Sequence, residues 1–464
     1  MSIQTVTDTI AAIATPLGNG GVGIVRLSGP QAAAIFTRTF TGARLSLAQP
    51  RRLILGQAQD EHGTPLDRCL GVWMPGPHSY TGEDVAELQC HGGVLLLRLV
   101  LQAVLDAGAR LANPGEFTLR AFLNGRMDLS QAEAVLDLIQ AKTPTSAQLA
   151  TAQLQGALRK PLSQLEADLT QLRAAITVAV DFPEDADAPS SQQVLHSLEQ
   201  LLAQIDQLLR NTTQGQLYRE GVRAVLVGAA NAGKSSLLNA LLATDRAIVT
   251  DQAGTTRDII NETLDLDGLP LVLTDTAGLR ASEGLDPAEQ QGMARSRQAM
   301  AAAQMLLIVV DSRSPGPDLP DLLQETAGQR RLLLLNKVDI TPPDQLAARL
   351  EQCRRLAPGE NPLLISAKTG AGLDQLRQAI LEQYTGTLDQ EQASPLVLHA
   401  RHSQALQAAR ACLLSALATL KSDLPLDLID IDLEEAAFQL GQISGSRAGE
   451  DLLDAIFSQF CLGK

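Results

Sequence analysis

The chain has 464 residues, enough for about three domains that each bury a hydrophobic core. Hydrophobic residues make up 45% and aromatic residues only 3%, which indicates ordered globular domains and argues against a single-stranded nucleic-acid binder built on aromatic stacking. The formal net charge is −15, so any contact with RNA has to come from a local basic patch.

Five cysteines without close spacing argue against a disulfide scaffold and against a CxxC zinc site. Residues 1–20 lack the basic and apolar regions of a signal peptide, and no uncharged apolar run approaches about 20 residues. We therefore expect a cytoplasmic protein that does not span a membrane.

The first region, residues 1–121, alternates short apolar runs with glycine and proline. Thr9–Ala14 and Val22–Leu27 are expected to be strands, and Val94–Leu105 is long enough for a helix. Gly18–Gly23 matches the GxGxxG pattern of dinucleotide-binding folds, but that pattern has to open a helix. The β-branched run that follows it indicates a strand, so we expect no dinucleotide site here.

Two segments that are far apart in the chain share an acidic, helical composition. Residues 127–215 and 385–464 each contain 5 basic and 11 acidic residues, so together they carry −12 of the net charge of −15. Leucine and isoleucine recur in both at spacings of three and four, which is typical of amphipathic helices. Because such stripes need partners, we expect one helical bundle, with coiled-coil dimerisation as the alternative.

Between these segments, residues 222–383 alternate short apolar runs with helical patterns. The expected strands are Ala224–Val227, Leu271–Thr274, Leu306–Val310, Arg331–Leu335 and Leu363–Ile365. Continuous apolar runs of this length are typical of strands buried on both faces, and their alternation with helices predicts a doubly wound parallel sheet.

The first of these strands leads into Gly228–Ser235, which fits GxxxxGK[ST] and opens the next helix. Glycines in such a loop let backbone N–H groups surround phosphate, while Lys234 neutralises the β- and γ-phosphates and the Ser235 hydroxyl binds Mg²⁺. The predicted nucleotide contacts in this region are Asn231, Ala232, Gly233, Lys234, Ser235 and Ser236.

Three further motifs follow later strands at their carboxyl ends, where such sheets bind ligands. Asp275–Gly278 can hold the water shell of the metal and meet the γ-phosphate. The aspartate of Asn336–Asp339 can accept two N–H groups that guanine has and adenine lacks, and Ser366–Lys368 would brace the base. This order predicts a GTP-binding domain, with Thr256 joining Ser235 on Mg²⁺. The further predicted contacts are Thr255, Thr256, Asp275, Thr276, Ala277, Gly278, Asn336, Lys337, Asp339, Ser366, Ala367 and Lys368.

The sequence lacks the glutamine that orients the attacking water in Ras-like GTPases, so another group has to assist hydrolysis. Leu279 stands where Ras-like enzymes place the glutamine that orients the attacking water. Asn231 and backbone oxygens near Thr250–Gln252 could surround a monovalent cation that substitutes for an arginine finger. Arg257 could supply that charge instead.

The chain ends in an amphipathic stripe, Leu452–Phe460, followed by Cys461–Lys464. The ending does not fit a prenylation box, because Gly463 and Lys464 occupy its last two positions. We expect the stripe to dock on an apolar partner and to carry Cys461 to a defined place, with a frayed terminus as the alternative.

Through these motifs and several further stretches, the sequence resembles the MnmE (TrmE) family of tRNA-modification GTPases over essentially its full length. The matching stretches are Asp8–Pro16, Gly20–Arg26, Pro114–Phe117, Arg120–Asn124, Asp128–Ala134, Asn231–Ser236, Gly254–Asp258 and Phe460–Lys464. The fold class we predict is α/β multidomain: an N-terminal α+β domain, a discontinuous all-α helical domain and an inserted doubly wound P-loop GTPase domain. The resemblance implies a folate-binding and dimerisation domain at 1–121, helical parts at 122–215 and 385–464, and the GTPase domain at 216–384.

The resemblance also implies partners and a reaction. A homodimer would form a heterotetramer with the FAD-containing protein MnmG (GidA) and build an aminomethyl or carboxymethylaminomethyl group at C5 of the tRNA wobble uridine. A bound 5-formyl-tetrahydrofolate would be the one-carbon source, with contacts at Arg26, Glu87, Arg126 and Lys464. The family commonly has lysine where Arg126 stands. A dimer of N-terminal domains would bring the tail near these residues, with Cys461 in a chemical role that stays undefined.

For GTP hydrolysis, the resemblance implies K⁺ stimulation and a glutamate beyond Asp275–Gly278 that positions water. Glu289 matches best, and Glu283 is the alternative. The predicted K⁺ ligands are Asn231, Thr250, Gln252 and Thr255. The alternative function is an Era-type GTPase switch in ribosome assembly, but such switches usually carry a basic RNA-binding domain, and the helical segments here are acidic.

Overall fold

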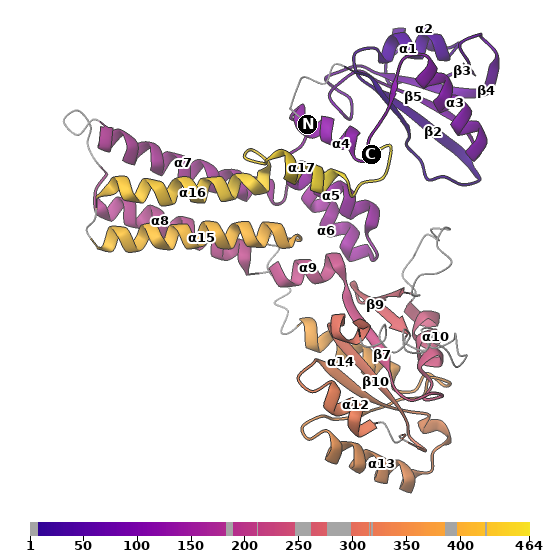
Figure 1. Cartoon of the computed structure of the whole chain (residues 1–464), viewed down its shortest axis with the longest axis vertical. Helices are drawn as coiled ribbons and strands as arrows, with labels where there is room; N and C mark the ends of the chain where they lie inside the picture. Colours follow the sequence, from indigo (N-terminus) through magenta and orange to yellow (C-terminus); the bar gives the residue numbers. More distant parts are fainter. Residues whose placement is uncertain are drawn as a thin grey trace. The chain divides into compact units, whose positions relative to one another are not determined.

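Figure 1 shows a computed structural model of the chain, which describes residues 8–181, 189–210, 212–245, 261–275, 298–314, 316, 319–385, 397–422 and 425–464. The chain divides into two compact units. Unit 1 comprises Met1–Leu136, Gln153–Gln204 and Ala405–Lys464, and unit 2 comprises Asp137–Ala152 and Ile205–Gln404. The domain boundaries predicted from the sequence remain predictions.

The N-terminal part of unit 1 is a six-stranded sheet of order β3-β4-β5-β2-β1-β6, in which only the β1–β6 pair is parallel. Its strands are β1 Ile10–Ile13, β2 Gly20–Ser28, β3 Ile54–Gln59, β4 Pro65–Met74, β5 Val85–Gly92 and β6 Arg110–Leu111. The helices α1 Ala32–Thr39, α2 Ala43–Ala48 and α3 Val94–Asp106 pack on this sheet. The predicted strands and helix are therefore present, and Gly20 begins a strand rather than a helix, as we expected.

A further helix, α4 (Glu116–Leu123), packs on the strand β1 through a separate apolar cluster. Phe117 is fully buried there against Ile10, Ala12 and Ala112. This helix is where the N-terminal sheet meets the end of the chain, as described below.

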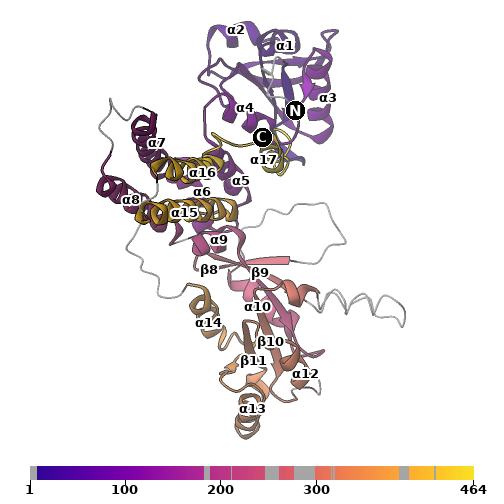
Figure 2. The ribbon, with the colours of Figure 1, turned by 60° about the vertical axis from the view of Figure 1, so that its left-hand side comes forward.

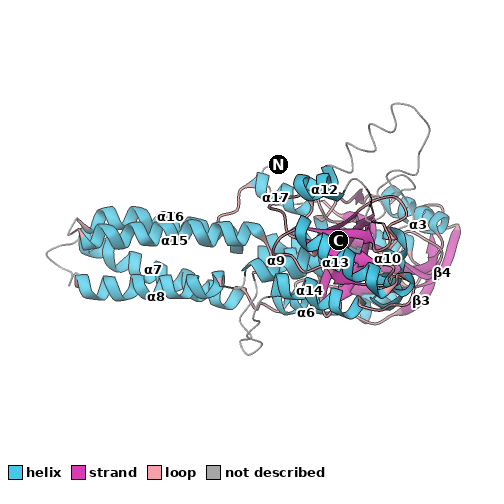
Figure 3. Cartoon of the chain, turned by 90° about the horizontal axis from the view of Figure 1, so that it is seen from below, coloured by secondary structure: helices cyan, strands magenta, loops and turns pink. Residues whose placement is uncertain are grey.

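Four long helices form the bundle predicted from the leucine stripes, and they lie side by side in Figures 1 and 3. They are α7 Arg159–Asp181, α8 Ser191–Leu209, α15 Ala400–Lys421 and α16 Leu426–Ser444. The α7 stripe, including Leu165 and Leu169, is buried, and α16 packs along this helix. Arg173 of α7 donates to both carboxylate oxygens of Asp430 on α16 at 2.9 and 3.2 Å. Pro161 lies in the first turn of α7, where no intrahelical bond needs its N–H, so it marks a helix start.

The end of the chain packs against α5 (Leu129–Gln140) rather than fraying. The last helix, α17 (Glu450–Phe457), buries Leu453, Ile456 and Phe457 in a cluster with Leu129. Phe460, just beyond α17, is also buried in that cluster. The predicted docking of the amphipathic stripe is therefore confirmed.

Unit 2 contains a six-stranded sheet of order β12-β11-β10-β7-β9-β8. Its strands are β7 Val222–Val227, β8 Asn261–Leu266, β9 Leu269–Asp275, β10 Met305–Asp311, β11 Arg331–Asn336 and β12 Leu363–Leu364. All pairs are parallel except β8–β9. One face is covered by α10 (Lys234–Asp245) and α14 (Leu373–Thr385), the other by α12 (Leu319–Glu325) and α13 (Pro343–Leu356). The doubly wound sheet, and with it the predicted fold class, is confirmed.

The strand β8 was not predicted, because its residues alternate polar and apolar rather than forming an apolar run. The available signal was Asp267–Gly268, a dipeptide that favours two-residue hairpin turns. Both residues have positive φ, 49° and 94°. The turn lies against the helix α6 (Pro144–Leu154) of the same unit, where the Thr143 hydroxyl donates to the Gly268 oxygen at 2.8 Å.

In the ranges that the structure describes, no helix is long and apolar enough to cross a membrane. The same ranges contain no group of three or more histidine, cysteine, aspartate or glutamate side chains that could hold a metal ion.

Candidate nucleotide-binding site

The predicted phosphate loop leaves the carboxyl end of β7, the strand that lies between β10 and β9. The chain order reverses at this strand, which is where doubly wound sheets bind their ligands. A Cβ atom at Gly228 would collide with the backbone oxygen of Val309, and one at Gly233 with Nδ2 of Asn336. Both glycines have positive φ, 145° and 97°, so the loop needs glycine at each position.

Lys234 is the first residue of α10, so the positive end of the helix dipole faces the loop. Its side chain is 6% exposed, and Nζ donates to the backbone oxygens of Gly228 and Ala229, both at 2.9 Å. The ammonium group is thus held inside the loop that precedes it. Ser235 and Ser236 follow in the first helical turn and are exposed.

Asn336, at the end of β11, ties the phosphate loop to the segment after β12. It is 1% exposed; Nδ2 donates to the Ala232 oxygen at 2.9 Å, and Oδ1 accepts from the Ala367 N–H at 3.0 Å. A buried amide with both ends satisfied fixes the two backbone segments relative to each other.

Lys337 adds a second link to the phosphate loop. Its backbone has φ of 69°, and Nζ donates to the Asn231 oxygen at 2.6 Å and to Asp311 at 2.8 Å. Asp339 is exposed and accepts from the Ser366 hydroxyl at 2.7 Å. The three sequence motifs that contain Asn231, Asp339 and Ser366 are therefore brought together at one edge of the sheet.

Asp311 is a part of this site that we did not predict. It ends β10 and forms ion pairs with Lys337 and Arg313, each at 2.8 Å. Burial raises the pKa of Asp311, but the hydrogen bonds from Arg313 and Lys337 outweigh it and hold the pKa well below its usual value. Its position at the carboxyl end of a strand, like that of Asn336, was the signal that could have identified it.

Several predicted site residues lie outside the described residues. They are Thr250, Gln252, Thr255, Thr256, Thr276, Ala277, Gly278, Glu283 and Glu289. The backbone of Asp275 ends β9, but its side chain is likewise not described.

In unit 1, Arg26 and Glu87 are directly opposite each other on the neighbouring strands β2 and β5. Arg26 Nε lies 2.8 Å from Glu87 Oε1, and both side chains are largely buried. The Arg26 guanidinium also lies 5.6 Å from the centre of the Tyr80 ring and 5.8 Å from that of Phe117. These distances are within the range of cation–π contacts.

The tail of the chain reaches the same place, and Figure 2 shows the C-terminus beside α4. Arg26 Nη1 donates to the Gly463 oxygen at 3.4 Å, and the Phe117 N–H donates to the Lys464 oxygen at 3.2 Å. Burial lowers the pKa of Lys464, as does the nearby Arg26. Cys461 is exposed.

The tail thus lies beside Arg26 of its own chain. The expected dimer of N-terminal domains stays a prediction. In contrast, Arg126 is exposed and lies beside Gly82, and within the described residues no hydrogen bond or ion pair joins it to Arg26, Glu87 or Lys464.

Arg120 of α4 is a buried cation whose role we did not predict. It is 1% exposed and forms ion pairs with Asp8 at 2.7 Å, Glu116 at 2.9 Å and Glu83 at 3.2 Å. These bonds fix α4, and therefore Phe117, against the sheet. Three carboxylates around one guanidinium compensate the cost of burying it.

The doubly wound sheet, the phosphate loop after its first strand and the adjoining Asn336–Asp339 segment define a P-loop GTPase. Two family profiles match the chain: the MnmE helical domain over residues 129–461 and the GTP-binding protein TrmE N-terminus over residues 9–126.

Two curated relatives are named tRNA modification GTPase MnmE. The protein of Roseiflexus castenholzii is 45% identical, over 98% of this chain and 99% of its own. That of Chloroflexus aurantiacus is 46% identical, over 98% of this chain and 100% of its own. The chain belongs to the MnmE family of tRNA modification GTPases.

Among solved structures, that of Era from Aquifex aeolicus is 24% identical and covers 41% of this chain and 66% of its own. Its TM-score is 0.30, so this likeness carries no argument for or against a role in ribosome assembly.

Proposed function

We propose that this chain is a guanine-specific GTP hydrolase that takes part in modification of the tRNA wobble uridine at C5. The observation that carries the nucleotide part is the network around Asn336, which joins the phosphate loop to the base-recognition segment in advance of binding. A site assembled in this way does not have to be ordered by the ligand, which reduces the free-energy cost of binding.

The residues of the loop suit a nucleoside triphosphate with Mg²⁺. Lys234 would exchange its two backbone acceptors for β- and γ-phosphate oxygens, and the exposed Ser235 hydroxyl is an oxygen ligand of the kind that Mg²⁺ prefers. Mg²⁺ would neutralise charge that develops on the phosphates. One oxygen of Asp339 accepts from the Ser366 hydroxyl, which would help to hold the carboxylate for the two N–H groups of guanine.

For the chemical step, we propose that Glu289 positions the attacking water, with Glu283 as the alternative. K⁺ would be held by Asn231, Thr250, Gln252 and Thr255 and would supply positive charge in place of an arginine finger. The Lys337–Asn231 hydrogen bond supports the Asn231 part of this proposal, because it fixes the backbone of that residue in the phosphate loop.

For the modification step, we propose that the Arg26–Glu87 region takes part in binding 5-formyl-tetrahydrofolate and that the tail presents Cys461 there. The fit is partial. One Glu87 oxygen is held by Arg26, so the second would accept the N–H groups of a pterin, and Tyr80 and Phe117 supply aromatic surface. The partners proposed are a second copy of the chain, the FAD-containing MnmG and tRNA, all in the cytoplasm.

The nucleotide assignment is tested by Asp339→Asn. The variant should bind GTP at least about tenfold more weakly for each lost hydrogen bond and should gain affinity for xanthosine triphosphate. Asp344→Asn, an exposed aspartate in the first turn of α13, is the matched control and should leave both affinities unchanged. Wild-type protein that binds ATP as tightly as GTP would refute guanine selection.

A further inference from the structure

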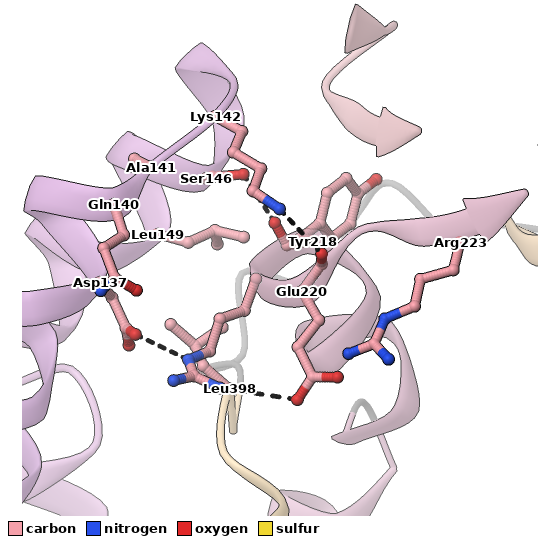
Figure 4. Close-up of a pocket in the computed structure, with 11 residues that line it drawn as sticks. Asp137, Gln140, Ala141, Lys142, Ser146, Leu149, Tyr218, Glu220, Arg223 and Leu398 are labelled. Carbon is pink, nitrogen blue, oxygen red and sulfur yellow. Dashed lines mark hydrogen bonds and ion pairs between the residues drawn. The ribbon is translucent and has the colours of Figure 1, made fainter. Parts of the chain in front are cut away.

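A cavity of about 180 Å³ lies within unit 2, where α5 and α6 meet α9 (Thr212–Glu220) and the start of β7 (Figure 4). Its charged lining residues are Asp137, Lys142, Arg219, Glu220 and Arg223. Nothing in the nucleotide site or in the tail region uses these residues.

Both carboxylates that line the cavity, Asp137 and Glu220, already form ion pairs. Asp137 accepts from Arg219 Nε at 2.6 Å and lies 2.7 Å from His399 Nε2. Burial raises the pKa of Asp137, but His399 and Arg219 outweigh it and lower the pKa. Glu220 Oε1 lies 3.6 Å from Arg219 Nη1, so Arg219 bridges the two acids.

The other two cations are Lys142 and Arg223, which is exposed; within the described ranges, neither forms such an ion pair. Lys142 Nζ reaches only the backbone oxygen of Glu220, at a long 3.4 Å. Among the residues that the structure describes, neither side chain has a carboxylate within ion-pair distance. Burial lowers the pKa of Lys142, repulsion from Arg223 lowers it further, and attraction to Glu220 opposes both in part. In a chain with a net charge of −15, two cations that line one cavity without an ion pair favour an anion there.

We propose that this cavity binds a small phosphate-type oxyanion between the ammonium of Lys142 and the guanidinium of Arg223. Its volume of about 180 Å³ accommodates inorganic phosphate or a small phosphomonoester. Guanidinium and ammonium groups are the donors that bind phosphate oxygens most strongly. This inference does not rest on the proposed function, because the cavity shares no residue with the nucleotide site.

The anion would also join two structural elements. Lys142 precedes α6, which contacts the β8–β9 turn, whereas Arg223 is the second residue of β7, the strand that leads into the phosphate loop. A bound oxyanion would therefore stabilise the packing of α6 on the sheet, and the thermal stability of the chain would depend on phosphate.

The test is calorimetric titration of the full chain with sodium phosphate, and separately with glycerol phosphate, at constant ionic strength. GDP and Mg²⁺ are kept in excess so that the nucleotide loop is occupied. Lys142→Met and Arg223→Gln should each weaken binding at least about tenfold, as expected for loss of a charged hydrogen-bond donor. Lys142→Arg should retain binding, and Lys421→Met, which changes an exposed lysine at the end of α15, should have no effect.

Tighter binding of inorganic phosphate than of glycerol phosphate identifies free phosphate as the ligand, and the opposite preference identifies a phosphomonoester. Phosphate should also raise the melting temperature of the wild-type chain and not that of Lys142→Met, whose circular dichroism spectrum shows whether it folds. Equal binding by wild type and the two cavity variants, or no binding of either anion, overturns the proposal. GTP hydrolysis without phosphate should be the same in Lys142→Met as in the wild type.

Discussion

Asn336→Ala removes the link between the phosphate loop and the base-recognition segment. The substitution leaves two backbone groups, the Ala232 oxygen and the Ala367 N–H, without their partner. A buried group left unsatisfied costs about 1–3 kcal/mol; Ala232 is buried and Ala367 half-buried, so we expect a total of about 2–4 kcal/mol. This is a large share of the stability of a typical domain, so the site should become less ordered and should bind GTP more weakly.

Unfolding of a multidomain chain is not a two-state process, so a local measurement is needed. Hydrogen exchange followed by mass spectrometry should show loss of protection at the Ala367 amide in Asn336→Ala. Asn336→Asp is the matched control: it keeps the acceptor for Ala367 but turns an oxygen toward the Ala232 oxygen. It should therefore retain protection at Ala367 and still weaken GTP binding. Wild-type exchange and wild-type GTP affinity in Asn336→Ala would refute the role we give to this residue.

Two further predictions concern the N-terminal sheet and the catalytic cation. Arg120→Met should destabilise unit 1 by about 3–5 kcal/mol because it leaves carboxylates without their buried partner, and urea unfolding followed by the fluorescence of Trp73 measures this. Burial raises the pKa of Glu116, but Arg110 and Arg120 outweigh it and lower the pKa. The ionised Glu116 carboxylate therefore stabilises the fold at pH values above 4.5, its pKa in the unfolded chain. In the same urea assay, this stabilisation should disappear as the pH falls below 4.5. A free energy of unfolding that does not change with pH in acid would contradict this prediction. GTP hydrolysis should be much faster in KCl than in NaCl at equal ionic strength, and equal rates would remove the K⁺ mechanism.

The elements that could be predicted from the sequence are those that a short, continuous sequence pattern defines. The phosphate loop is a short pattern between an apolar strand and a helix, and glycine is required at Gly228 and Gly233 for reasons that the backbone itself imposes. The strands of the second sheet were likewise predictable, because burial on both faces leaves a continuous apolar run. The strand β8 was missed because it lies at the edge of the described sheet, beside β9, and carries an alternating pattern.

Contacts between residues far apart in the chain could not be predicted from such local patterns. The amphipathic stripe before Cys461 indicated that the tail docks, but not that Arg26 and Phe117 of the same chain would hold its backbone. The ion pairs of Arg120 were equally hidden, because the sequence does not show that this arginine is buried among three carboxylates. Asp311 has no motif of its own and acts through Lys337.

The central claim is that this chain couples GTP hydrolysis to modification of the wobble uridine. The most direct test is mass spectrometry of wobble uridines in tRNA from a strain that lacks the chain. Complementation uses the wild type, Asp339→Asn and a form without residues 461–464. We predict that the C5 modification is lost in the deletion strain and is restored only by the wild type, although the truncated form still hydrolyses GTP. Normal C5-modified uridines in the deletion strain would contradict the account.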